Sequence, residues 1–347
     1  DVDGQGNTAR FFVPTGVCFA NGYVYVADAG NNKIKKIDGQ GVVTTIAGSG
    51  TAGFADSSAL LCKMNNPTDV VVDNNGVVYF ADYGNHCIRK IQGGAVTTIA
   101  GLGGNSGDIL GAAPAARFNR PRSLCMDGAG NIYIADLMNN KIKVLSATSN
   151  IVSLVAGSIQ GYVDGAGASA EFYHPTGIDI DMWGNLVIAD AGNNCVRRCT
   201  LAGVVSTLAG TGASGYADGP VLSSTFNDVE GISADAQGNV YVGDKANNVI
   251  RKLTTVDVGV FAPVNSMDLL LFPNPVTDKL IIRDNAGDDA LSLVQIFSVE
   301  GRLVKQISVG EYKGDFTIDI SDLAAGLYDV VATTQNDNVL SSRITKE

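Results

Sequence analysis

The amino-acid sequence repeats with a constant step of 54 residues, and this period limits the possible folds more than any other feature of the chain. Five aspartates mark it: Asp28, Asp82, Asp136, Asp190 and Asp244. Each ends a short run such as YVYVAD or NIYIAD, whose β-branched and aromatic residues are typical of a β-strand. A fixed period of this kind predicts an array of similar units that pack on their neighbours.

Two further signatures divide each repeat into four short strands. Four repeats end on a run of the type VTTIAG, at 43–48, 96–101, 152–157 and 205–210, and four open on a proline, at positions 14, 67, 121 and 175. Gly/Asn-rich stretches at 73–76, 127–131 and 235–239 predict hairpin turns, because these residues tolerate positive φ. The pattern predicts an all-β fold, a β-propeller of four-stranded blades with five visible repeats and five or six blades in the full-length protein. Nothing repeats at helical spacing, which excludes an α-solenoid.

The two ends of the array differ from its middle. Residues 3–11 match the inter-blade segment 164–172, so the chain is expected to begin inside such a segment, with a fourth-strand signature upstream of Asp1. No signal peptide precedes Asp1, so we expect a mature form or a fragment. The fifth repeat runs through Lys252-Leu253 without a copy of VTTIAG. This asymmetry predicts that a strand from the N-terminal side closes the ring.

Composition narrows the class of partner. The net charge of −11 argues against nucleic acid, because phosphate contacts need clustered Lys and Arg. No apolar run reaches the ~18 residues of a spanning helix, so a membrane-spanning segment is not expected. None of the six cysteines forms a CxxC pair, and Cys195 and Cys199 are too far apart on one predicted strand for a disulfide. Most of them are interpreted as small buried apolar residues.

The repeat resembles the NHL repeat. The resemblance rests on P-x-G-V/I, then V/I-Y-V/I-A-D, then N-N-x-I/V-R/K-K/R, as they recur in this sequence. GTGASGYADG at 210–219 and ARFNRP at 116–121 are similar to the long bacterial form of that repeat. The resemblance covers residues 1 to about 260. It implies a propeller, which we place at residues 1–262.

After Phe261 the period is lost, and a different β pattern follows a predicted linker at 263–270. In residues 271–347, Leu280/Ile282 and Val294/Ile296 show the period-two spacing of a small β-sandwich. The ordered motifs FPNPVTDKLII, LVQIFSVEGRLVKQI, FTIDISDLAAGLYDVVA and SSRITKE resemble the C-terminal sorting domain (type A) of the type IX secretion system of Bacteroidetes. The resemblance implies recognition by the type IX secretion machinery through 271–347, passage via the periplasm, and a secreted or outer cell-surface location.

Catalytic chemistry finds little support in the sequence. The five repeated aspartates are interpreted as structural, accepting hydrogen bonds from the following turn or pairing with Lys35 and its counterparts. With His86 and His174 as the sole histidines, a three-His zinc site is not possible. A calcium site near Asp179 and Asp181 stays open. The chain has no GxSxG elbow, and we predict no catalytic residue, no metal and no cofactor.

Binding through loops on a rigid frame is the remaining hypothesis. The side chains that follow each repeated aspartate differ between repeats, and the predicted contacts with a ligand are Tyr83, His86, Leu137, Met138 and Lys245. We therefore predict a non-catalytic binding module for a protein, peptide or glycan. Two alternatives stay open: an extracellular hydrolase or lyase with its site in the propeller channel, and a structural surface module without a discrete ligand.

Overall fold

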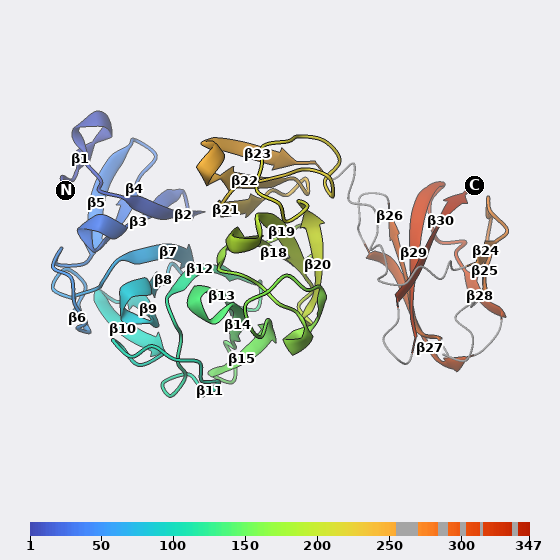
Figure 1. The fold of residues 1–347 in the computed structure, drawn as a ribbon, viewed down its shortest axis with the longest axis horizontal. Coiled ribbons are helices and arrows are strands. Elements are labelled where there is room, and N and C mark those ends of the chain that lie inside the picture. The colour runs from blue at the N-terminus through green and yellow to red at the C-terminus, as the bar shows by residue number, and fades with distance from the viewer. Residues whose placement is uncertain (255–269, 284–290, 299–302, 313–314, 335–338) are drawn as a thin grey trace. The chain divides into compact units, whose positions relative to one another are not determined.

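The computed structural model of the chain describes residues 1–254, 270–283, 291–298, 303–312, 315–334 and 339–347 (Figure 1). Two compact units divide the chain, Asp1–Thr254 and Thr255–Glu347. The predicted linker at 263–270 lies outside the described residues except for its last residue. No helix in the described part of the chain is long and apolar enough to cross a membrane.

The first unit consists of five antiparallel sheets that follow one another in sequence, each repeat forming one blade (Figure 1). The innermost strands are β2 (Pro14–Ala20), β7 (Pro67–Val72), β12 (Pro121–Met126), β17 (Pro175–Ile180) and β21 (Val229–Ala234). The second strands are β3 (Tyr23–Asp28), β8 (Val78–Asp82), β13 (Ile132–Asp136), β18 (Leu186–Asp190) and β22 (Val240–Asp244). The third strands are β4 (Lys33–Ile37), β9 (Cys87–Gln92), β14 (Lys141–Leu145), β19 (Cys195–Cys199) and β23 (Val249–Leu253). The fourth strands are β5 (Val42–Ala47), β10 (Ala95–Ala100), β15 (Ile151–Ala156) and β20 (Val204–Ala209). The predicted β-propeller is confirmed.

Four blades have one strand more than the sequence predicts. The segment that precedes each blade adds a two-residue strand to the outer edge of that blade, beside its fourth strand: β1 (Gly4–Gln5), β6 (Ser57–Ser58), β11 (Gly111–Ala112) and β16 (Gly165–Ala166). The chain therefore runs along the rim before it returns to the axis, which explains the long period. In the fifth blade three strands are described. Strand β1 pairs with β5 of its own blade and does not complete the fifth.

The hydrophobic core lies between successive blades rather than within one of them. Four apolar clusters each combine residues of two neighbouring blades. In the cluster between the second and third blades, Ile88 packs with Leu124 and Ile134, all at most 3% exposed. Each blade is consequently stabilised by its neighbours, as expected for a repeat array.

The two end faces of the array lack this cover. Ile250 in the fifth blade is 75% exposed, although the equivalent residues Ile34, Ile88, Ile142 and Val196 are fully buried. In the first blade, Val17 and Phe19 are 68% and 74% exposed. In the other blades, the neighbouring blade buries these positions. The described ring is therefore open between its first and fifth blades.

This difference predicts a sharp contrast between two chemically identical substitutions. Ile142→Ala removes buried atoms and leaves a cavity, so it should lower the free energy of unfolding by about 2–5 kcal/mol. Ile250→Ala removes atoms that already contact water and should change it by about 0.5 kcal/mol or less. Urea unfolding of the two variants checks both values. Equal losses would show that Ile250 is covered in the folded protein.

The second unit consists of two antiparallel sheets. One has the order β24 (Leu270–Phe272), β25 (Lys279–Arg283), β28 (Asp315–Asp319), and the other β27 (Leu303–Tyr312), β26 (Leu291–Ser298), β29 (Gly326–Thr334), β30 (Val339–Lys346). One apolar cluster joins residues from both sheets, and Leu280, Ile282, Val294 and Ile296 are fully buried in it. The expected period-two burial of a small sandwich is thus observed. All six cysteines of the chain are unpaired, and five of them are buried.

Candidate binding face

Each repeated aspartate clamps its blade to the segment that precedes it. The Oδ1 atom of Asp136 accepts the backbone N–H of Asn119 at 2.7 Å. Its Oδ2 atom accepts the Asn139 amide at 2.7 Å and contacts the Lys143 ammonium at 2.7 Å. The other four aspartates accept the N–H groups of Phe12, Asn65, Tyr173 and Asn227 in the same way. The expected backbone donor in the following turn is not the one observed: the turn supplies an asparagine side chain, and the backbone N–H comes from upstream.

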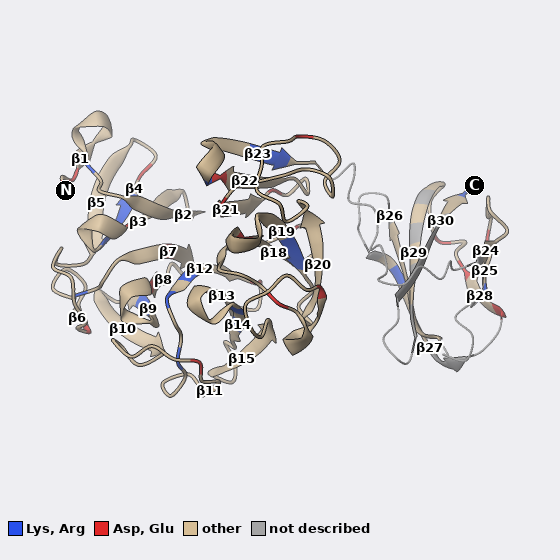
Figure 2. Ribbon diagram, in the orientation of Figure 1, with Lys and Arg blue, Asp and Glu red and all other residues tan. Residues whose placement is uncertain are grey.

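The cation of each clamp also holds a second carboxylate. Lys143 is fully buried and contacts Asp108 at 2.8 Å as well as Asp136. The same double pairing joins Arg89 to Asp56 and Asp82, Arg197 to Asp164 and Asp190, and Arg251 to Asp218 and Asp244. Figure 2 colours Lys and Arg blue, and blue segments lie on third strands such as β23. The second carboxylate lies in the inter-blade segment, so the cation ties strand and segment together.

Loss of one clamp should act on stability. In Asp136→Ala the buried Lys143 loses its buried anion and keeps the half-exposed Asp108 and the carbonyl of Arg117, and breaking a buried pair costs about 3–5 kcal/mol. Thermal and urea unfolding should both show this loss. Asp218→Ala is the control, because Asp218 is 79% exposed and an exposed pair contributes about 1 kcal/mol or less. An Asp136→Ala variant of unchanged stability would refute the structural role.

A second tie joins each blade to the next one. A short 3-10 turn follows each repeated aspartate: η2 (Ala29–Asn31), η3 (Tyr83–Asn85), η4 (Leu137–Asn139), η6 (Ala191–Asn193) and η7 (Lys245–Asn247). Two further 3-10 turns lie in inter-blade segments, η1 (Gly6–Thr8) and η5 (Gly167–Ser169). The residue after η4 is Asn140, and its Oδ1 accepts the backbone N–H of His174 in the next blade at 2.9 Å. His86 replaces asparagine at this position, and its Nδ1 accepts the N–H of Arg120 at 3.0 Å. Neutral imidazole is required for that bond.

The histidine tie predicts a pH dependence. Burial and the nearby Arg120 guanidinium lower the pKa of His86 below its ordinary 6.5. The unfolded chain therefore takes up a proton at a higher pH than the folded one, and stability falls as the pH drops below about 6.5. His86→Asn restores the residue found in the other blades and removes this contribution. Urea midpoints at pH 7 and pH 5 should differ less in the variant than in the original chain. An identical pH profile would show that His86 does not titrate on unfolding.

The positions whose N–H groups take part in these ties have left-handed backbone and carry different side chains. Val13, Asn66, Arg120, His174 and Asp228 are equivalent positions with φ between 49° and 59°. Such φ values are uncommon outside glycine and persist where the surroundings impose them. Four of the five donate their N–H to the preceding blade. The fixed backbone thus presents a different side chain in every blade.

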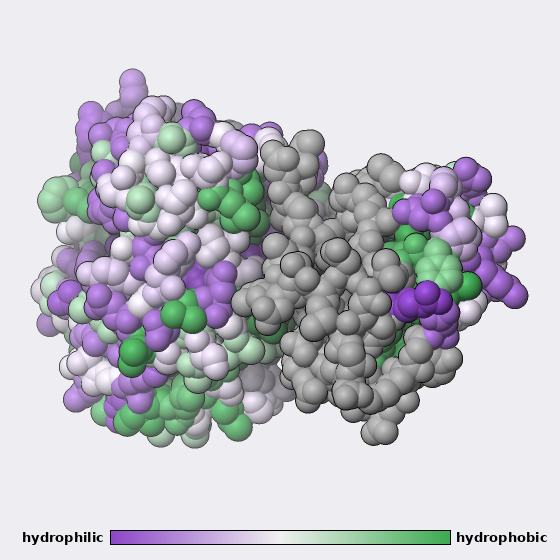
Figure 3. All heavy atoms as spheres, turned by 45° about the vertical axis from the view of Figure 1, so that its right-hand side comes forward, coloured by the Kyte–Doolittle hydropathy of each residue, from purple (hydrophilic) through white to green (hydrophobic). Residues whose placement is uncertain are grey.

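The predicted ligand contacts lie on the face where these turns and residues meet, which we call the loop face. Tyr83 is half-buried, with the Arg120 guanidinium 5.6 Å from its ring centre. Met138 is 39% exposed and donates its N–H to the carbonyl of Asn119. Lys245 lies farther along, in the fifth blade, and pairs with Asp228 and Glu230 at 2.8 and 2.9 Å. Figure 3 shows hydrophobic atoms in separate groups among hydrophilic ones on the visible side of the propeller. The structure therefore gathers four of the five contacts on blades two and three and leaves Lys245 apart from them.

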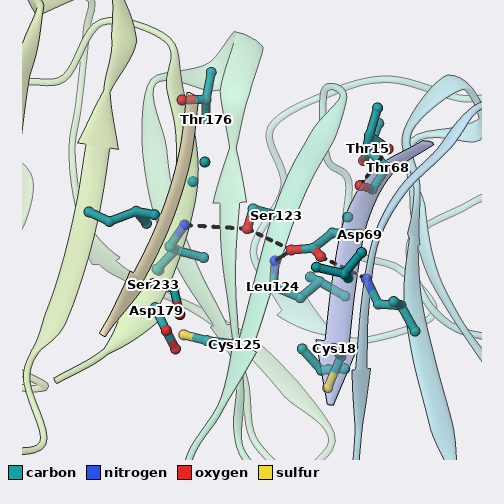
Figure 4. Close-up of a pocket in the computed structure, with 18 of the residues that line it drawn as sticks. Thr15, Cys18, Thr68, Asp69, Ser123, Leu124, Cys125, Thr176, Asp179 and Ser233 are labelled. Atoms are coloured by element: carbon teal, nitrogen blue, oxygen red, sulfur yellow. Dashed lines mark hydrogen bonds between the residues drawn. The ribbon is translucent and has the colours of Figure 1, made fainter. Parts of the chain in front are cut away.

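The innermost strands surround a cavity of about 700 Å³ (Figure 4). In it, Asp69 accepts the Ser123 hydroxyl at 2.6 Å and the Leu124 N–H at 2.8 Å, and burial raises the pKa of Asp69 to about 6. Asp179 accepts two backbone N–H groups, those of Ile180 and Ala234. Both carboxylates thus fasten strands of neighbouring blades to each other.

The hydroxyls near the mouth of the cavity act in the same way. Thr68 donates to the carbonyl of Arg122 at 2.7 Å, and Thr176 donates to that of Val229 at 2.9 Å. Above them, Arg122 of the third blade pairs with Glu230 of the fifth at 3.1 Å. The mouth is therefore bridged by an ion pair, and the wall below it is held by hydrogen bonds between blades.

Metal-binding geometry is not found in the described ranges, where no three His, Cys, Asp or Glu residues are grouped to hold an ion. Of the two residues considered for calcium, Asp181 accepts the N–H groups of Trp183 and Asn185 in its turn and pairs with Arg198 at 2.8 Å. Asp179 is engaged in the cavity wall as described.

Comparison with known proteins agrees with both units. Residues 64–91 match the NHL repeat, and residues 270–347 match the secretion system C-terminal sorting domain. The chain is 30% identical to NHL repeat-containing protein 2 of Gallus gallus, over 72% of this chain and 40% of that protein. It is 27% identical to protein SUPPRESSOR OF QUENCHING 1, chloroplastic, of Arabidopsis thaliana, over 92% of this chain and 31% of that protein. The chain thus spans 31% to 41% of the length of the first such relatives.

Solved structures show the same fold. An auxiliary nutrient binding protein from Bacteroides ovatus ATCC 8483 superposes with a TM-score of 0.54 at 21% identity, over 70% of this chain and 59% of that one. A protein of the same description from Bacteroides thetaiotaomicron VPI-5482 gives 0.53 at 19%, over 69% and 58%. The chain is an NHL-repeat β-propeller followed by a secretion system C-terminal sorting domain. The sorting domain indicates export to the cell surface or secretion.

Proposed function

We propose that the propeller is a non-catalytic binding module that acts outside the cell and takes up a protein, peptide or glycan on its loop face. The observation that carries the proposal is the combination of a repeated, rigid backbone with side chains that differ in every blade. Equivalent positions hold Arg120, His174 and Asp228 on left-handed backbone of nearly the same φ. Loops on such a frame are a common place for recognition.

The cavity supports binding rather than catalysis. A carboxylate that acts as a general base must lie within hydrogen-bond reach of a substrate proton. Asp69 and Asp179 instead accept hydrogen bonds from the backbone of neighbouring strands. Protonation of either carboxylate would weaken hydrogen bonds that join two blades.

The C-terminal unit supports the location of this activity. Its match to a secretion system sorting domain is the reason to place the propeller outside the cell. By this proposal, 271–347 are recognised by the type IX secretion machinery after passage via the periplasm, and the mature propeller is secreted or held at the outer surface. The two Bacteroides proteins that share the fold carry the description auxiliary nutrient binding protein, which is consistent with a binding role.

Site-specific photo-crosslinking tests the loop face. A photoreactive phenylalanine analogue replaces Met138 in one preparation and Asn74 in another, because Asn74 is exposed in a hairpin turn between the first two strands. Each is illuminated in concentrated spent culture medium of the producing cells. Adducts are expected at 138 and not at 74. Tyr83→Ala with Met138→Ala should weaken binding of the captured partner by about 1–3 kcal/mol with the fold intact. Adducts confined to 74 would move the site to the opposite face, and none at either position would reject the proposal.

A further inference from the structure

Arg120 differs from the other cations around the mouth of the propeller because its charge is not balanced. Arg122 pairs with Glu230, and Lys245 pairs with Asp228 and Glu230. Arg120 is exposed and makes no ion pair with any residue that the structure describes. Its guanidinium lies over the Tyr83 ring, 5.6 Å from the centroid, which leaves its outer edge available for hydrogen bonds.

The backbone that carries this guanidinium is held on both sides. The N–H of Arg120 is bound by His86, and φ at Arg120 is 59°. The preceding N–H, that of Asn119, is bound by the clamp carboxylate of Asp136. A ligand group that pairs with Arg120 therefore meets a guanidinium whose attachment point is already ordered, which lowers the entropic cost of binding.

An apolar surface adjoins the cation. The carbonyl of Asn119 accepts the N–H of Met138, so η4 lies next to the residue that precedes Arg120. The Met138 side chain is 39% exposed there. Methionine adapts its shape to aliphatic partners. The backbone of Arg120 thus adjoins a turn that presents an adaptable apolar side chain.

The rings of Tyr83 and Tyr173, on the loop face of blades two and four, are not open platforms for sugars. Arg120 covers one face of Tyr83. The Tyr173 ring is half-buried: its centre lies 4.5 Å from that of the His174 ring, and a Cβ built at Gly192 would lie 2.4 Å from Tyr173 ring carbons. A bound glycan commonly needs an exposed ring face, whereas a peptide side chain needs a pocket and a charge. The geometry favours a peptide.

The charge around the site limits the ligand to one or few acidic groups. Burial lowers the pKa of both His86 and His174, so neither adds a positive charge at pH 7. The whole chain has a net charge of −11, which repels a polyanion.

From these observations we propose that Arg120, Tyr83 and Met138 form a subsite for a peptide that carries an Asp or Glu side chain next to an aliphatic one. The carboxylate pairs with the guanidinium fork in a two-pronged contact. The aliphatic neighbour packs on Met138. The inference rests on the proposed binding function and narrows its partner to acidic, apolar peptide segments.

A paired peptide array tests this subsite. Each immobilised peptide with Asp or Glu beside Leu, Ile or Met has a counterpart with Asn or Gln, and the array is probed with the fluorescently labelled full chain. Acid peptides should bind about tenfold more strongly than their amide counterparts, as expected for a charge-assisted hydrogen bond. Arg120→Gln should abolish this preference. Arg120→Lys should keep only part of it, because lysine lacks the fork. Lys90→Gln, on the third strand of the second blade, is the control and should keep it in full.

Three results would overturn the inference. They are equal binding of acid and amide peptides, an acid preference that survives Arg120→Gln, and binding of oligogalacturonate in solution without binding of any peptide. Thermal unfolding of each variant checks the fold, and Arg120→Gln should leave it unchanged because this exposed side chain has no ion pair among the described residues. Peptide binding that needs Tyr83 and Met138 but no acid would reject the subsite alone. Absence of both peptide binding and adducts at 138 would reject the proposed function with it.

Discussion

In blades two to five, a buried cation is held between two carboxylates, one at the end of the second strand and one in the segment that precedes the blade. In the first blade, Lys35 contacts Asp1 and Asp3 of that segment at 2.7 and 2.9 Å and lies 3.8 Å from Asp28. Arg89 and Lys143, for example, are fully buried. A buried charge that loses its partner destabilises a protein by several kcal/mol. The segment therefore cannot leave the blade without a large loss of stability. The position of every loop on the binding face follows from this pairing, because the same segment leads directly into the residues that form the face.

The rigid frame and the variable side chains belong to different parts of the same loops. The Asp136 carboxylate and the His86 ring fix backbone atoms, whereas the side chains attached to those atoms are free to differ. Arg120 shows the division most clearly, since its N–H is part of the frame and its guanidinium belongs to the surface. A propeller can in this way change its partner without changing its fold.

Much of the fold could be predicted from the sequence because a repeated aspartate after an alternating apolar run is visible in one dimension. The two-residue outer strands, such as Ser57–Ser58, could not, because they show no alternation and exist only through pairing with the fourth strand. The upstream donor to each clamp was also hidden, since every residue except proline has a backbone N–H. The left-handed backbone at Arg120 follows from the neighbouring blade and not from any preference of arginine. The pairing of Lys245 with Asp228 was not apparent either, because the two residues are 17 apart in sequence and meet only in the folded chain.

The outer strands and the double ion pairs also define the unit of chain that a gene duplication would have to include. Asp108 and Lys143 lie 35 residues apart within one repeat, and Asp56 with Arg89 and Asp164 with Arg197 are 33 apart. A duplicated stretch that starts a few residues before the outer strand, at the aspartate of the inter-blade segment, therefore brings both carboxylates and the cation of its own clamp. A stretch that starts at the innermost strand would bring the cation and the carboxylate of the second strand, but not the carboxylate of the segment that precedes its own blade. Arrays of this kind are expected to lengthen by whole modules, each made of one inter-blade segment and the blade that follows it. Every such module contains the cation and both carboxylates of its clamp.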